Sequence, residues 1–255
     1  MTTATAPRRK TPTQGVHRTK THLYYFNGAG PWSGVTTITK VLDAPALTNW
    51  KMTEVARSAI ENAERLVEDR EAGKTEAAVK YLTTLSTTAM DRGSRIHGSI
   101  EQVLRREPAD IDPRDEAAVA GARAWLNDQA TQHGLRPLEV EAFLISETHG
   151  YGGTLDLIAE LDGETWLLDW KTGKSVAWPS GDVYSDHRLQ LAAYAHADFI
   201  AKPGDPTRYP LPEVTRFGIV HVTDGGTRLY EAPVTDADWT AFRACLHLHA
   251  WRKGK

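Results

Sequence analysis

The sequence is poor in cysteine and has no long apolar run, and both absences exclude whole classes of protein. Cys245 is the only cysteine among the 255 residues, so an intrachain disulfide, a cysteine-rich zinc site and an iron–sulfur cluster are excluded. No run of about 18 apolar residues is present, so no membrane span is predicted. No apolar stretch follows the basic residues 8–10, so we expect no signal peptide and a cytoplasmic protein.

Two further absences concern nucleotides and charge. The Gly-x-x-x-x-Gly-Lys-Ser/Thr motif of nucleotide-driven motors is missing, so any ATP-driven motor activity would need a partner. The net charge is −3, so the protein as a whole is not basic. Residues 1–22 nevertheless carry five lysines and arginines and no acid. We expect a flexible basic tail over 1–22, with contact to nucleic-acid phosphates as the alternative.

Apolar periodicity divides the rest of the chain into a helical part and a strand-rich part. We expect helices over 46–70, 76–85, 88–105, 112–133, 187–201 and 236–251. Strands are expected over 24–26, 35–39, 138–145, 154–161, 165–171, 214–222 and 227–234. Thr235, followed by Asp238, resembles a capping box that starts the last helix.

This order of elements predicts an α/β fold in which helices flank a mixed central β-sheet. At 28.2 kDa the chain has room for one domain with an elaboration. We expect a single domain over 23–255, with a mostly helical elaboration at 46–133 and a catalytic α/β core at 134–255.

The most informative residues are two carboxylates and a lysine on adjacent predicted strands. Asp156 lies on the first strand, and Asp169 and Lys171 lie near the end of the second, after a turn at 162–163. Side chains at i and i+2 of a strand share a face, so Asp169 and Lys171 project together and the hairpin can bring Asp156 beside them. Alone, Asp-x-Lys is more often a solvated strand end or a cross-strand salt bridge.

The predicted helix over 88–105 carries a second polar group. His97 and Glu101 are four residues apart and share a face, with Gly93 one turn earlier. Glycine destabilises a helix interior by about 1 kcal/mol relative to alanine, which indicates a close approach of another backbone or a ligand. A histidine bonded to Glu101 on a solvated face is the simpler interpretation, and with Asp156 and Asp169 elsewhere a metal site becomes plausible.

Four motifs follow one another in a fixed order along the chain. They are Gly93-x-x-x-His97-x-x-x-Glu101, Gly153-x-x-Asp156, Asp169-x-Lys171-Thr172-Gly173 and Gln190-x-x-x-Tyr194. In this order they resemble the PD-(D/E)XK nuclease superfamily, and the chain looks most like the branch with the RecB-type nuclease domain. The matching residues span 93–194, two-fifths of the chain. Residues 34–47 bear a looser resemblance to phage-encoded exonucleases of this branch.

The resemblance implies a restriction-endonuclease-like core that binds one or two divalent ions, Mg²⁺ or Mn²⁺. It implies that His97, Asp156 and Asp169 ligate an ion together with the main-chain carbonyl of Trp170. Asp156, Asp169 and Lys171 would be the catalytic residues, with Lys171 orienting the attacking water and stabilising developing charge.

The same resemblance extends to the surroundings of the site. Glu101 and Glu141 would lie next to the metal ligands without binding the first ion, or they would bind a second ion. The residues expected to position DNA are Gln190, Tyr194, Arg92 and Arg95.

Three functions follow as hypotheses. The first is a DNA exonuclease that resects duplex ends for recombination or repair, and the second is a structure-specific or defence endonuclease. The third is a nucleic-acid-binding protein without cleavage, against which the intact set of Asp156, Asp169 and Lys171 argues. DNA is the expected partner, with a recombinase or single-strand annealing protein and a homo-oligomer as open alternatives.

Overall fold

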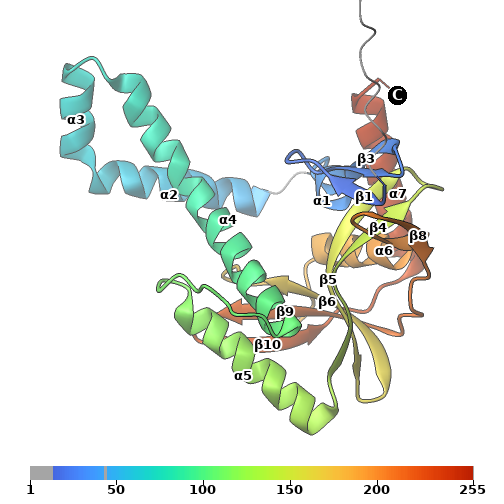
Figure 1. Ribbon diagram of the computed structural model, residues 1–255. Helices are drawn as coiled ribbons and strands as arrows, with labels where there is room; N and C mark the ends of the chain where they lie inside the picture. The colour runs from blue at the N-terminus through green and yellow to red at the C-terminus, as the bar shows by residue number, and fades with distance from the viewer. Residues whose placement is uncertain (1–13, 43–44, 255) are drawn as a thin grey trace, which may run out of the picture.

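The computed structural model describes residues 14–42 and 45–254, in which a mixed sheet of ten strands forms the centre of the molecule (Figure 1). The strands are β1 Val16–Arg18, β2 Leu23–Phe26, β3 Ala29–Gly34, β4 Arg136–Ser146, β5 Tyr151–Leu161, β6 Glu164–Lys171, β7 Phe199–Lys202, β8 Asp205–Tyr209, β9 Arg216–Thr223 and β10 Gly226–Glu231. The helices are α1 Val35–Thr39, α2 Pro45–Glu61, α3 Ala63–Glu71, α4 Thr75–Arg105, α5 Glu116–His133, α6 Ser185–Ala195 and α7 Asp236–Arg252. The expected fold class, a mixed sheet flanked by helices, is confirmed.

The long strand β5 organises the sheet. One of its edges pairs antiparallel with β4. Its other edge is shared: β3 runs parallel to it as far as Gly152, and β6 pairs antiparallel with it from Leu157 onward. On that edge the register puts no residue of either strand opposite 153–156. The fork between β3 and β6 therefore leaves Asp156 at a gap in the sheet.

Helices cover both faces of the sheet. On one face α1, α6 and α7 pack against the sheet around buried residues such as Ile38, Leu191 and Phe242. On the other face the last turns of α4, around Ile96, pack together with the first and middle turns of α5, around Ala122. Each helix burial follows from apolar residues at helical spacing, and the two cores hold β5 and β6 rigidly between them.

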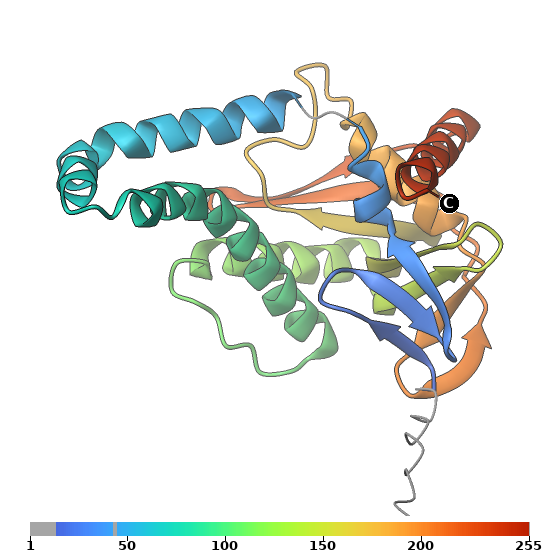
Figure 2. The same cartoon turned by 90° about the horizontal axis from the view of Figure 1, so that it is seen from above.

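A helical arm extends from this core. It is made of α2, α3 and the first half of α4, and it points away from the sheet in both views (Figures 1 and 2). Because α4 runs on from the arm into the core, one 31-residue helix joins the two. No helix of the described residues is long and apolar enough to cross a membrane.

Several sequence predictions are wrong, and packing explains them. We expected a flexible segment as far as residue 22, but Val16–Arg18 is a strand because it pairs with β2 and buries Val16. Residues 1–13 of that segment lie outside the described residues. The β-prone residues 35–39 form α1, since at helical spacing Val35 and Ile38 both reach the core. Packing here overrides the β propensity of the branched side chains.

Two helix boundaries also differ from expectation. Residues 76–105 were expected as two helices and form the single helix α4, because no glycine or proline interrupts residues 84–90. The helix expected over 187–201 ends at Ala195, and Phe199 begins β7, where it packs against Phe26. The hairpin of β5 and β6 and the capping box of Thr235 with Asp238 are confirmed.

Candidate functional site

A cleft of about 450 Å³ opens at the gap in the sheet, between α4, β4, β5, β6, α6 and the N-terminal strands. Its lining brings together most of the residues of the four sequence motifs and adds Glu141: Gly93, His97, Glu101, Glu141, Gly153, Asp156, Asp169, Lys171, Gln190 and Tyr194. Residues that lie far apart in the sequence therefore share one cavity.

Asp156 and Asp169 form the floor of this cleft. They are 8% and 1% exposed, respectively. Oδ2 of Asp156 accepts a hydrogen bond of 2.7 Å from the main-chain nitrogen of Trp170, so β6 holds that carboxylate in place across the hairpin. Burial of two neighbouring carboxylates is costly unless cations or donors compensate them.

His97 and Glu141 approach Asp156 from two other elements. Nδ1 of His97, on α4, lies 3.5 Å from Oδ2 of Asp156. Glu141 is opposite Asp156 across the β4–β5 register, between the pairs Val140–Leu157 and Ala142–Leu155. One ligand atom from each of His97, Glu141 and Asp156 lies within 4.8 Å of the others. An imidazole and two carboxylates at this spacing can hold a divalent cation.

The backbone of Glu141 is strained. Its φ is +48°, inside the strand β4. For a residue with a Cβ the left-handed region costs roughly 1–2 kcal/mol, and such strain gathers at functional sites. The strain supports a specific role for this carboxylate in the cleft.

The charges of these groups are strongly coupled. Burial, together with the charges of Asp156 and Glu101, raises the pKa of Glu141 to about 8. Burial also raises the pKa of Asp169 to about 6, although the Lys171 ammonium opposes it. Burial would also raise the pKa of Asp156, but the hydrogen bond from His97 and the charge of His97 outweigh burial. The pKa of Asp156 is therefore lowered. Burial and mutual repulsion therefore make Glu141 and Asp169 harder to ionise than free carboxylates.

Lys171 is oriented by α6. Its ammonium donates to Asp169 and, at 3.2 Å, to Oε1 of Gln190. The amide nitrogen of Gln190 in turn donates to Asp169 at 2.9 Å and to the Tyr194 hydroxyl at 2.8 Å. Both oxygens of Asp169 thus accept hydrogen bonds from the chain itself, and Gln190 fixes the positions of Asp169 and Lys171 relative to each other.

Two glycines of the motifs allow close packing. A Cβ on Gly93 would lie 3.0 Å from Oγ1 of Thr172, so the expected close approach is real, and a side chain makes it. A Cβ on Gly153 would lie 2.6 Å from the Tyr194 ring. Both glycines therefore let α4 and α6 lie tightly against the hairpin.

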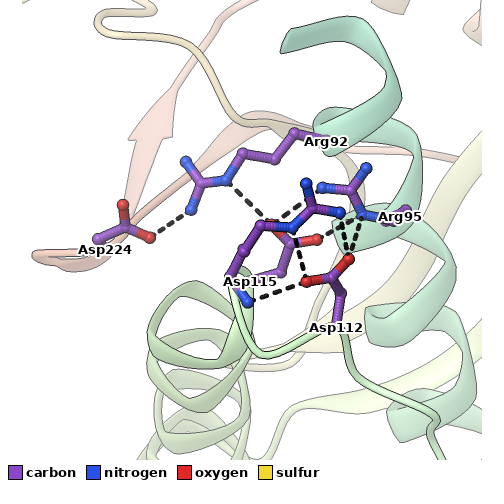
Figure 3. A network of polar contacts seen from close by, with 6 residues as sticks. Arg92, Arg95, Asp112, Asp115 and Asp224 are labelled. Atoms are coloured by element: carbon purple, nitrogen blue, oxygen red, sulfur yellow. Dashed lines mark hydrogen bonds and ion pairs between the residues drawn. The ribbon is translucent and has the colours of Figure 1, made fainter. Parts of the chain in front are cut away.

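Three residues expected near the site have other partners. Glu101 lines the cleft but accepts a hydrogen bond of 2.9 Å from Arg105. Arg92 and Arg95 do not line the cleft. Their guanidinium groups pair with Asp115, which is 1% exposed, at 3.0 and 2.7 Å (Figure 3).

This network gives the two arginines a structural role that differs from the expected contact with DNA. A buried carboxylate needs cationic partners, and α4 supplies them to the start of α5. Arg92 also pairs with Asp224, in the turn between β9 and β10, and Arg95 lies 3.6 Å from Asp112 (Figure 3). The network thereby anchors the helix that carries His97.

The basic wall of the cleft was not predicted from the sequence. Arg18, His22, Tyr24 and Thr154 all line it. Nη1 of Arg18 donates to Oγ1 of Thr154 at 3.5 Å, and the Tyr24 hydroxyl lies 3.1 Å from the same oxygen. Thr154 is two residues from Asp156 on β5, so the period-2 rule could have placed it on the same face.

The charge of this wall is uncompensated. No carboxylate pairs with Arg18 among the residues that the structure describes. Burial, and after it the nearby charges of Arg18 and Lys40, lower the pKa of His22, so two cations lie close to this ring. The cleft therefore has an acidic floor and a basic wall.

Comparisons with known proteins agree with this geometry. Residues 75–198 match the family profile of the PD-(D/E)XK nuclease superfamily. Mitochondrial genome maintenance exonuclease 1 of Homo sapiens is 30% identical over 112 residues, which are 42% of this chain and 30% of that protein. The chain thus spans about a third of the length of this curated relative.

Among solved structures, SSO0001 shows a weak likeness. It has a TM-score of 0.30 and 12% identity, over 62% of this chain and 75% of that chain. The family match covers the acidic floor, Lys171 and Gln190. Residues 75–198, just under half of the chain, are therefore similar to the PD-(D/E)XK nuclease superfamily.

Proposed function

We propose that this protein is a metal-dependent DNA exonuclease. The observation that carries the proposal is the cleft itself, where the cluster of His97, Glu141 and Asp156 lies beside the pair of Asp169 and Lys171. The basic wall around Arg18 supports a phosphodiester substrate, because an acidic floor alone would repel one.

The donor atoms of the cleft fit a divalent cation. The raised pKa values of Glu141 and Asp169 come first from burial and then from the charges of neighbouring carboxylates, and a bound cation would favour the ionised form of both groups. Carboxylate oxygens with one imidazole favour Mg²⁺ or Mn²⁺. We propose His97, Asp156 and Glu141 as ligands, with Asp169 and the Trp170 carbonyl completing the set and Glu101 available for a second ion.

When bound, the cation supplies positive charge and Lewis acidity to the phosphate and the attacking water. The residues of the chain position the water and the DNA strand. Lys171, held by Asp169 and Gln190, presents an ammonium that orients the attacking water and counters charge developing on the phosphate oxygens. Gln190 and Tyr194 act on DNA through this positioning. Arg18 contacts a neighbouring phosphate and aligns the strand.

The choice of exonuclease rests on two further points. The similar human protein is named an exonuclease, and α4 links the cleft directly to the projecting arm, which would let a strand end thread past the site. An endonuclease of the same fold is the alternative. A recombination or repair pathway, a recombinase or annealing partner and a homo-oligomer stay predictions, as do the basic tail and the division of the domain at residue 134.

The first test compares end-labelled linear duplex with covalently closed circular DNA, each with EDTA, Mg²⁺ or Mn²⁺. We expect metal-dependent loss of the linear substrate only. Asp156→Ala and Asp169→Ala should abolish cleavage yet retain DNA binding, since each removes a negative charge that faces the phosphates. Asp236→Ala, at an exposed acid on α7, is the matched control and should cleave normally.

Cutting of the closed circle as fast as the linear duplex would favour the endonuclease instead. Loss of folding or of DNA binding in both cleft variants would contradict their assignment to the metal site. Circular dichroism of each variant separates a folding defect from a chemical one.

Lys171→Ala tests the role of the ammonium. We expect turnover at saturating metal to fall by about 10²–10³-fold, because one preorganised charge-stabilising group is lost. The KM for DNA should change much less. Lys202→Ala, on β7, is the control. Unchanged single-turnover rates in Lys171→Ala would remove this residue from the mechanism.

The pH dependence of metal binding tests the acidic cluster. The pKa values of Asp169 and Glu141 lie above the ordinary carboxyl range. Their contribution to the free energy of unfolding is therefore fully present at pH values below that range, where both groups are protonated. It is lost as the pH rises through about 6 and about 8. Without metal, their contribution to the unfolding free energy therefore falls over this window. Ligands must be deprotonated to bind a cation, so added Mg²⁺ should raise the Tm more at high pH than at low pH.

Glu141→Gln should flatten this dependence above neutral pH, because it removes the group that titrates near pH 8. Glu213→Gln, at an exposed acid, should leave it intact. A Mg²⁺-induced shift of Tm that is equal at all pH values in the unmodified protein would argue against binding at these carboxylates.

A further inference from the structure

Trp178 is a large aromatic side chain that the fold leaves in solvent. It is 60% exposed, whereas tryptophan is on average among the most buried residues. It lies in the loop between β6 and α6, seven residues after Lys171. The exposure of this ring, in the loop that directly follows the strand of Lys171, therefore needs a physical explanation.

The loop is held firmly, so the exposure does not come from a loose segment. Val176 and Val183 are buried at its base, and Ala177 and Val183 form a β-bridge. Two hydrogen bonds of 2.9 Å close the tip, from the nitrogen of Trp178 to Asp182 and from the nitrogen of Gly181 to Trp178. The backbone of Trp178 is thus fixed on both sides.

The ring is also oriented. Its centroid lies 4.9 Å from that of Tyr184, with an interplanar angle of 78°. An edge-to-face contact of this kind stabilises one orientation of the pair. Because a single aromatic neighbour supports it, much of the indole surface remains available, and little entropy would be lost on binding a flat partner.

A continuous row of side chains joins this ring to the cleft. The Tyr184 ring lies 6.0 Å from the His187 ring. His187 and Gln190 are three apart on α6 and therefore share a face, and Gln190 accepts a hydrogen bond from Lys171 at 3.2 Å. Trp178 thus stands at the outer end of a row whose inner end is the catalytic lysine.

We propose that Trp178 is a stacking platform for an unpaired base of the strand that enters the cleft, and that the substrate is DNA with a single-stranded end. The inference rests on the proposed function and names its substrate class. A base inside a duplex is already stacked on both faces, so the platform selects for unpaired bases. Lys174 is exposed in the same loop, four residues before Trp178, so the loop carries both a cation and an aromatic ring, the combination that single-strand binding surfaces use.

A nucleobase fits this surface better than a protein does. The other exposed large hydrophobic side chains of the described residues come from other segments: Leu42, Met52, Ile60, Val67, Val79, Leu248 and Trp251. A single ring in a polar loop offers far less apolar area than the core of a stable protein interface. One flat ring is, however, enough for one base.

The test measures binding without cleavage, in EDTA, by fluorescence anisotropy of a labelled oligothymidylate and of a blunt duplex of equal length. Trp178→Ala should weaken single-strand binding by about 5- to 150-fold, the range for the loss of one base–aromatic stack. Affinity for the blunt duplex should stay the same. Trp178→Phe should restore most of the single-strand affinity, and Trp251→Ala, at an exposed tryptophan on α7, should match the unmodified protein.

Equal affinity of Trp178→Ala and the unmodified protein for the single strand would overturn the inference, and so would an equal loss for both DNAs. A change of oligomeric state in Trp178→Ala with unchanged DNA affinity would assign the ring to a second copy of the chain and overturn it too. Failure of the proposed function gives a different result: no cleavage by the unmodified protein with any metal, while the single-strand effect of Trp178 persists.

Discussion

The burial of two neighbouring carboxylates, Asp156 and Asp169, is the constraint around which the rest of the structure is arranged. Each lies on a strand with solvent almost excluded, and each must be compensated. The Trp170 amide and His97 stabilise Asp156, and Lys171 and Gln190 stabilise Asp169. Glu141 is crowded against these carboxylates, and burial together with the charge of Asp156 raises its pKa. A divalent cation would relieve that repulsion.

Several elements of the fold hold these two carboxylates in place. The fork of β5 between β3 and β6 creates the gap in the sheet where Asp156 lies. The long helix α4 carries His97 to the gap and is anchored on its other side by the pairing of Arg92 and Arg95 with Asp115. The cleft therefore depends on contacts well outside it, and the two arginines hold α4 in place without lining the cleft.

The sequence predicted the hairpin of β5 and β6 because strand periodicity and the turn at 162–163 are local signals. It also predicted that His97 and the two aspartates meet, through motif order. It could not predict the basic wall, since Arg18 reaches the cleft only when Val16–Arg18 joins the sheet. Nor could it predict that Arg92 and Arg95 lie outside the cleft. Their pairing with Asp115 spans 23 and 20 residues of sequence and depends on how α4 and α5 pack. Gly93 was correctly singled out, although Thr172 was not foreseen as its neighbour.

The central claim is that the cluster of His97, Glu141 and Asp156 holds the catalytic cation. Crystals soaked in Mn²⁺ test it most directly, through anomalous scattering recorded above and below the manganese absorption edge. The account predicts an anomalous peak in contact with these three side chains, and its disappearance in Asp156→Asn crystals. A manganese ion bound elsewhere in the cleft without them, or no peak there at saturating Mn²⁺, would contradict it.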